Sequence, residues 1–134
     1  MQMRNIDIEK MLNGKSMTGR AVNFKIRTDK WHKVISDRKK GAFGEIFVTG
    51  WFIAKIGDLK PVDLRLLGYS SVEEYLKEPF NKGMTTESVK KFICWNRFNP
   101  NWEVLAKFGY HEPYDEADYW ADHYDAQIED RCDF

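Results

Sequence analysis

The segment "GAFGEIFVTGWFIAKIG", residues 41–57, constrains the fold of this chain more than any other part of the sequence. It is rich in β-branched and aromatic residues, which favour strands, and Gly44 and Gly50 interrupt it. This composition predicts either one long strand bent by a bulge or two strands in succession. Bends of this kind help a small sheet to close, so the segment favours a small antiparallel barrel.

The residues before this segment predict a helix followed by a strand. The stretch "NIDIEKMLNGK" has apolar residues at helical spacing, with Asn5 as its N-cap and Gly14 as its end. The stretch "AVNFKIR", residues 21–27, alternates apolar and polar residues and predicts a half-buried strand.

The pattern changes at Pro61, which suits the first position of a helix that ends at Gly68. Ser70 or Ser71 then predicts the start of a second helix, because a glutamate follows three residues later. Residues 85–98 begin with a helical pattern and finish as a strand, and residues 101–110 resemble a closing strand. We therefore expect an α+β fold, a small antiparallel β-barrel decorated by short helices.

The composition fits one compact domain over residues 1–110 and a separate tail over residues 111–134. The chain has 134 residues, of which 43% are hydrophobic, enough to bury a core. No membrane span or secretory signal is evident, and Cys94 and Cys132 form no metal-binding or disulfide pattern. We expect a cytoplasmic monomer with reduced thiols and without a metal or cofactor.

Charge is distributed unevenly, although the net charge is zero. Residues 1–60 contain 13 Lys and Arg against 6 Asp and Glu, whereas residues 111–134 contain 1 against 9. Such asymmetry indicates nucleic-acid binding combined with an acidic tail. The tail spacing predicts a helix after Pro113. It can complete the core, cover the basic surface as a nucleic-acid mimic, or bind a basic partner protein.

The stretch "GKSMTGR", residues 14–20, gathers Lys15, Thr18 and Arg20 where the first helix ends. Arginine offers a planar fork of donors, lysine a point charge and threonine a neutral donor, and together these groups suit a phosphate. They also suit hydrolysis, because a lysine of lowered pKa can serve as the base for a threonine nucleophile. An ordinary solvated loop is the third interpretation.

Further cations follow along the chain, and Trp31 stands among them. A tryptophan next to lysines can stack on a base while the lysines neutralise phosphates, although Trp31 suits the core equally well. The candidate nucleic-acid-binding residues are Lys15, Arg20, Lys25, Arg27, Trp31, Lys33, Lys39 and Lys40.

Three stretches resemble the ASCH domain, a branch of the PUA-like fold: "MLNGKSMTGR", "GDLKPVDLRLLGYSSVEEYLKEPF" and "FICWNRFNPNWEVLAKF". The resemblance implies a β-barrel that binds RNA or a modified nucleobase in a cleft beside the first stretch. One branch of the family hydrolyses N4-acetylcytidine with a lysine, a threonine three positions later and an acid. The resemblance gives the first two roles to Lys15 and Thr18, and Asp63 or Glu73 can substitute for the acid.

These observations predict an ASCH-type domain that binds RNA or a modified nucleoside around Lys15, Thr18 and Arg20. The alternatives are a nucleoside amidohydrolase or a ribonuclease that uses the same loop, and a protein-interaction module that acts through its acidic tail.

Overall fold

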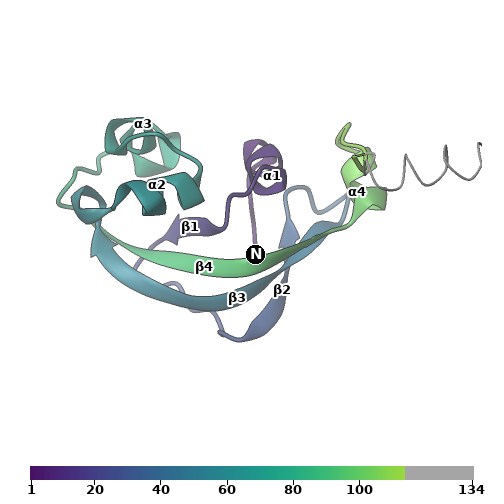
Figure 1. The fold of residues 1–134 in the computed structure, drawn as a ribbon, viewed down its shortest axis with the longest axis horizontal. Helices are drawn as coiled ribbons and strands as arrows, with labels where there is room; N and C mark the ends of the chain where they lie inside the picture. Colours follow the sequence, from purple (N-terminus) through teal and green to yellow (C-terminus); the bar gives the residue numbers. More distant parts are fainter. Residues whose placement is uncertain (114–134) are drawn as a thin grey trace, which may run out of the picture.

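The structure, a computed structural model, describes residues 1–113 and contains one four-stranded antiparallel sheet (Figure 1). The strands have the order β1-β4-β3-β2, so β1 and β2 are the two edges. The α+β class is confirmed, but the sheet is open in the described residues, so the expected closed barrel is not seen. The strands are β1 (Met17–Arg20), β2 (Lys30–Ile35), β3 (Ala42–Lys55) and β4 (Val89–Pro100).

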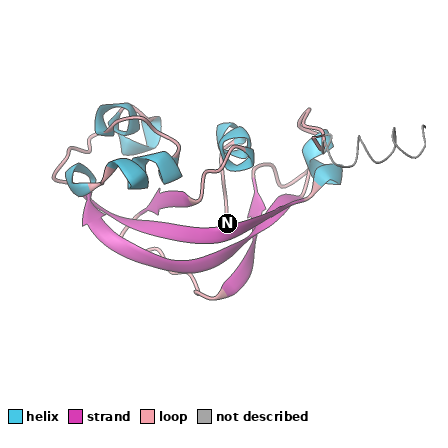
Figure 2. Cartoon of the chain, viewed as in Figure 1, coloured by secondary structure: helices cyan, strands magenta, loops and turns pink. Residues whose placement is uncertain are grey.

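The helices lie on one side of the sheet, and short loops connect them to the strands (Figure 2). None of the helices in residues 1–113 is long and apolar enough to cross a membrane. The acidic helix expected after Pro113 lies outside the described residues. The helices are α1 (Asn5–Leu12), α2 (Pro61–Leu67), α3 (Val72–Leu76) and α4 (Trp102–Ala106), with 3-10 turns η1 (Ile56–Asp58) and η2 (Pro79–Asn81).

The long segment that dominated the sequence pattern forms one bent strand, β3, which confirms the first of the two alternatives. Its register with β4 shifts twice, because Phe47 pairs with Arg97, Val48 with Trp95, and Gly50 with Cys94. The first shift leaves an extra residue on β4 and the second leaves an extra residue on β3. Paired bulges bend both strands without changing the register beyond them.

The prediction of a strand at residues 21–27 is wrong, because these residues form a turn followed by a loop without regular structure. The strand lies earlier, at Met17–Arg20, where the backbone pairs with β4. The loop is anchored by Lys91, whose Nζ donates to the carbonyl oxygen of Phe24 at 2.6 Å, and Phe24 packs against the core. Alternation of apolar and polar residues is therefore not accompanied by strand pairing here.

Two later expectations are also wrong. Residues 89–100 form a continuous strand without a helical start, and residues 102–106 form helix α4 where a closing strand was expected. Asn101 begins α4 by accepting a hydrogen bond from the backbone N–H of Val104. Leu105 is the fully buried residue of this helix.

The helix ends follow the sequence signals closely. Helix α2 begins at Pro61 and ends at Gly68, whose φ of +95° is the left-handed conformation that glycine adopts most easily. Ser71 caps α3 by accepting a hydrogen bond from the N–H of Glu74 at 3.1 Å. Helix α1 is capped by Arg4 instead of the expected Asn5.

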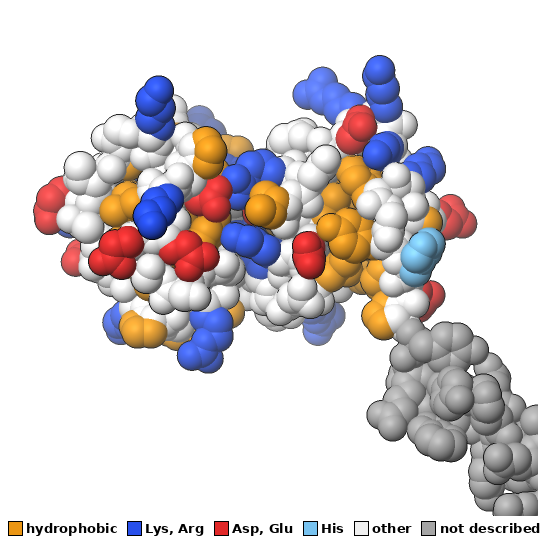
Figure 3. Space-filling view, turned by 90° about the horizontal axis from the view of Figure 1, so that it is seen from above, with side chains coloured by type: hydrophobic (Ala, Val, Ile, Leu, Met, Phe, Trp, Pro, Cys, Tyr) orange, Lys and Arg blue, Asp and Glu red, His pale blue; other side chains and the backbone are white. Residues whose placement is uncertain are grey.

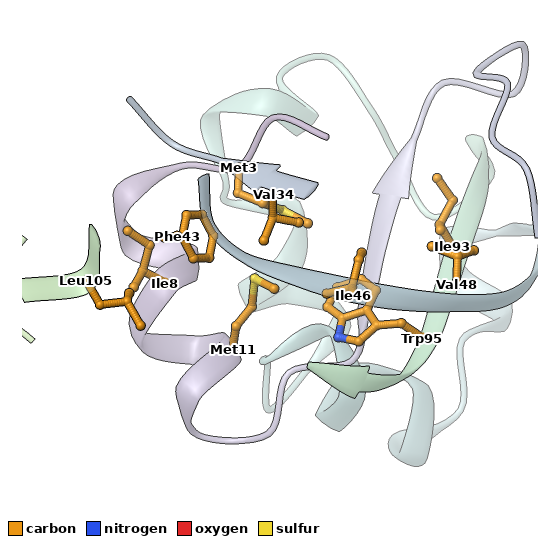
Figure 4. Packing of buried hydrophobic residues seen from close by; sticks show 10 residues of the cluster. All are labelled: Met3, Ile8, Met11, Val34, Phe43, Ile46, Val48, Ile93, Trp95 and Leu105. Carbon is orange, nitrogen blue, oxygen red and sulfur yellow. The ribbon is translucent and has the colours of Figure 1, made fainter. Parts of the chain in front are cut away.

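The core consists of two clusters on the bent β3–β4 pair. Ile46 and Val48 of β3 contribute to the first cluster, which packs under α1 and α4, and Figure 4 shows Ile8 of α1 against Phe43. Phe52 and Ala54 of the same strand pack against the second cluster, which lies under α2 and α3. Strand β3 therefore supports two helical groups on one face, and the surface between these groups is available for a site.

Candidate functional site

A cleft of about 570 Å³ lies between the N-terminal segment with α1, strand β1 and the region around α3 and η2. Its walls carry three aromatic rings, those of Tyr69, Tyr75 and Phe80. Lys and Arg side chains gather near the middle of the helix-bearing face (Figure 3). The charged side chains that line the cleft are Arg4, Asp7, Lys15, Arg20 and Lys90.

Lys15 enters the cleft because Gly14, with a φ of +107°, turns the chain at the end of α1. Only 6% of Lys15 is exposed, and its Nζ donates to the backbone carbonyl oxygen of Leu67 at 2.6 Å. Burial lowers the pKa of Lys15 to about 8, with Asp7 opposing the shift and nearby cations adding to it. Lys15 is thus a buried amine that titrates close to neutral pH.

Thr18 and Arg20 lie in the cleft with Lys15, so the three residues singled out in the sequence are brought together. The guanidinium of Arg20 donates to Thr18 Oγ1 at 3.1 Å and to the backbone carbonyl oxygen of Gln2 at 2.6 Å. Burial lowers the pKa of Arg20 below its usual value. These contacts hold the guanidinium in place and orient the hydroxyl of Thr18 as an acceptor.

Lys90 is a site residue that the sequence did not reveal. Its Nζ donates to Tyr75 Oη at 3.0 Å and to Asn81 Oδ1 at 2.8 Å, and only 4% of the residue is exposed. Burial, and to a smaller extent the charge of Arg20, lowers the pKa of Lys90 to about 8. One signal was available, because a lysine on the apolar face of a strand is unusual, but these residues were expected to be helical.

The carboxylate in the cleft belongs to Asp7, not to Asp63. Asp7 is 7% exposed, accepts a hydrogen bond from the backbone N–H of Arg4 at 3.1 Å, and influences the pKa values of Lys15 and Arg20. Asp63 instead accepts a hydrogen bond from the N–H of Lys60 at the start of α2 and does not line the cleft. Glu73, the other substitute, does not line it either.

The remaining cations predicted to bind nucleic acid lie outside the cleft. Lys25 and Arg27 are exposed on the loop between β1 and β2, and Lys33, Lys39 and Lys40 lie on β2 or in the turn that follows it. Trp31 on β2 is 40% exposed and packs edge to face on Phe47 with ring centroids 5.5 Å apart. Trp31 is thus partly packed and partly exposed, which lies between the two interpretations of a core residue and of an exposed surface for base stacking.

The cleft combines buried cations with aromatic walls, a set of groups that suits an anionic or ring-containing ligand. In the described part of the chain, His, Cys, Asp and Glu side chains form no group of three or more that could hold a metal ion. Fold and cleft together define an α+β domain with a cleft lined by buried cations and aromatic rings.

Crystal structures of ASCH proteins have the same fold. ASCH from Zymomonas mobilis aligns with a TM-score of 0.56 at 11% sequence identity, over 86% of this chain and 82% of that chain. A serine-to-alanine mutant of the same protein, ZmASCH, aligns with a TM-score of 0.57 at 11% identity, over 87% and 82% of the two chains. No family model matches this sequence, and no curated protein matches it significantly. The fold of this chain is therefore ASCH-like.

Proposed function

We propose that this chain binds RNA or a modified nucleoside in the cleft between α1 and α3. The observation that carries the proposal is that four cationic side chains and three aromatic rings line the same 570 Å³ space with a single carboxylate. This volume is in the usual range for a small-molecule site, about 300–1,000 Å³. The ASCH-like fold supports the proposal, because the resemblance in the sequence implies this class of ligand.

The two kinds of lining residue have separate roles in such a complex. The ring of Phe80, which is 44% exposed, offers a base a surface for stacking, which contributes about 1–3 kcal/mol per base. Lys15 and Arg20 donate to oxygen atoms, and their charges attract a ligand that carries phosphate. Thr18 Oγ1, already an acceptor for Arg20, can donate its own proton to the ligand.

The proposal is tested by titrating the protein with nucleosides and short single-stranded RNAs, using calorimetry. Lys15→Met keeps most of the apolar stem and removes the charge, and we expect it to weaken binding by about tenfold or more. Lys82→Met is the matched control, because Lys82 is exposed and does not line the cleft. Equal effects of the two variants, or no binding of any nucleoside or RNA, would contradict the proposal.

Hydrolysis is the second candidate, and one observation favours it. Lys15, whose pKa is lowered to about 8, lies in the cleft with Thr18 and Asp7. Asp7 provides an acid in the cleft, where neither Asp63 nor Glu73 lies. A neutral Lys15 can accept the proton of Thr18 as the hydroxyl attacks the carbonyl carbon of an N-acetylated base. The C–N bond then breaks, Lys15 returns the proton to the leaving amine, and water hydrolyses the acetyl ester of Thr18 to acetate. Mass analysis of N4-acetylcytidine and of RNA after incubation tests this; Thr18→Ala should abolish any product.

A further inference from the structure

Lys90 has donor capacity that the protein does not use. An ammonium group has three N–H donors, and Lys90 Nζ makes hydrogen bonds to two acceptors, Tyr75 Oη and Asn81 Oδ1. Asn81 is fixed in turn, because its Nδ2 donates to the backbone carbonyl oxygen of Tyr75 at 2.8 Å. The ammonium is therefore held by a rigid neutral frame and keeps one donor for a ligand in the cleft.

The buried cations of the cleft also lack ion pairs with acidic side chains. Within residues 1–113, the ion pairs join Arg4 to Asp7 and Glu78, and Lys55 to Glu87, so Lys15, Arg20 and Lys90 have none. Lys15 Nζ has one hydrogen-bond acceptor, the carbonyl oxygen of Leu67. Buried charges without counter-ions are costly for the folded state, and a bound anion would offset that cost.

The depth of these cations indicates which part of a ligand reaches them. Lys90 is 4% exposed and Lys15 is 6% exposed, whereas the side chain of Arg4 is 37% exposed. A phosphodiester in the middle of an RNA strand carries a nucleotide on both sides and requires a groove that is open at two ends. A terminal group needs only one entrance, so a buried cluster of cations fits a phosphate monoester.

The rings lie next to the cations at a suitable distance for one nucleotide. Lys90 Nζ is 4.8 Å from the ring centroid of Phe80 and 5.1 Å from that of Tyr75, and Lys15 Nζ is 5.9 Å from that of Tyr69. Phe80 is 44% exposed, whereas Tyr69 and Tyr75 are buried, so a base that packs on the exposed part of Phe80 has its phosphate near Lys90.

We propose that Lys90, with Lys15 and Arg20, forms a binding site for the terminal phosphate of a nucleotide, either free or at the end of an RNA strand. This inference rests on the proposed function, since it specifies the ligand of the same cleft. The oxygens of the phosphate accept hydrogen bonds from the unused donors of the two lysines. Both terminal nitrogens of the Arg20 guanidinium already donate within the protein, to Thr18 and Gly19 and to Gln2 and Met3, so Arg20 contributes mainly its positive charge. Tyr75, hydrogen-bonded to Lys90, positions the ammonium group.

The experiment compares cytidine, cytidine 5′-monophosphate and inorganic phosphate by calorimetry at pH 7. We expect the monophosphate to bind about tenfold or more tightly than cytidine, because its phosphate accepts charge-assisted hydrogen bonds from the lysines. Lys90→Met should weaken binding of the monophosphate more than binding of cytidine and thereby lose most of this preference. Lys90→Arg, which keeps the charge, should retain part of the preference, and the exposed control Lys82→Met should retain all of it.

Thermal unfolding of each variant shows whether it is folded, and Lys15→Met serves as the second test if Lys90→Met does not fold. Equal affinity of the wild-type protein for cytidine and its monophosphate would overturn the inference and leave the proposed function intact. Binding of inorganic phosphate without any nucleoside or RNA would instead overturn the proposed function. A four-nucleotide RNA with a 5′-phosphate or a 5′-hydroxyl distinguishes RNA ends from free nucleotides.

Discussion

Gly19 of β1 lies directly against the hydroxyl group of Tyr75, so closely that a Cβ atom at position 19 would overlap it. The same Cβ would lie 3.1 Å from Lys90 Cε, which is also closer than ordinary packing allows. The absence of a side chain at Gly19 therefore provides the space in which Tyr75 and Lys90 meet.

Replacing Gly19 by alanine should displace Tyr75 and break its hydrogen bond with Lys90. We expect a loss of about 1–3 kcal/mol in the free energy of unfolding, typical of overpacking, and weaker binding of cytidine 5′-monophosphate. Gly50→Ala is the control, because no atom lies within 4 Å of its added Cβ. Denaturant unfolding and calorimetry measure the two effects, and similar results for both variants would refute the steric argument.

The lowered pKa values of Lys15 and Lys90 predict how stability depends on pH. Between their folded values of about 8 and the ordinary lysine value of 10.5, the unfolded chain binds more protons than the folded chain. The free energy of unfolding should therefore rise as pH increases from 8 to about 10. Above that range, Tyr75 opposes the rise, because burial raises its pKa to about 12. The charged and titratable groups around the two lysines are Arg4, Asp7, Lys10, Arg20, Tyr69, Tyr75 and Glu78.

Denaturant unfolding at pH 7, 8, 9 and 10 checks this prediction. Lys15→Met and Lys90→Met should each flatten the rise, since each removes one of the two titrating groups. Saturating cytidine 5′-monophosphate should also flatten it, because a bound anion keeps the lysines protonated. A rise of the same size in both variants would assign it to other groups.

The exposed cations outside the cleft should matter for long RNA but not for a mononucleotide. Lys25→Gln and Arg27→Gln remove charges that do not line the cleft, so the affinity for cytidine 5′-monophosphate should stay unchanged. If these side chains contact phosphates of a longer strand, each substitution should lower the slope of log affinity against log salt by about 0.7. An unchanged slope for a 12-nucleotide RNA would exclude this loop from the interface.

Glu78 holds Arg4 at the edge of the cleft through an ion pair of 2.7 Å. Glu78→Gln should leave Arg4 paired with Asp7 alone and raise the affinity for a phosphate ligand about two- to fivefold, equivalent to a modest ion pair. Glu87→Gln breaks a similar pair with Lys55 on the exposed surface and should leave the affinity unchanged. Weaker binding by Glu78→Gln would show that the pair positions Arg4 for the ligand.

Much of the fold could be predicted from local signals in the sequence. Pro61 and Gly68 mark the ends of α2 because each has a characteristic backbone geometry. The β-branched and aromatic residues mark β3 because they favour the extended backbone of a strand. Pairing partners are not local. The alternation in residues 21–27 gave no indication that the loop lacks a neighbouring strand. The alternation in residues 101–110 likewise predicted a strand, although residues 102–106 form helix α4.

The site was predictable only where its residues are close in the sequence. Lys15, Thr18 and Arg20 lie within six residues of one another, from the end of α1 into β1, whereas Lys90 meets Tyr75 and Asn81 from 15 and 9 residues away. Asp7 was missed because its position in the first turn of a helix is an ordinary one for an acid. Its relation to Lys15 depends on the turn at Gly14, which composition does not specify.

The paired bulges of β3 and β4 lie between the parts of β3 on which the two walls of the cleft pack. The cluster under α1 includes Ile46 and Val48, before the second bulge, and Phe52 and Ala54 beyond it pack against the cluster under α2 and α3, so we expect the bend at Thr49 and Asn96 to influence the distance between the walls. On this expectation, ligand size depends on the backbone of the sheet as well as on the lining side chains. Related chains could therefore accept larger or smaller ligands by gaining or losing a bulge residue, with every contact residue retained.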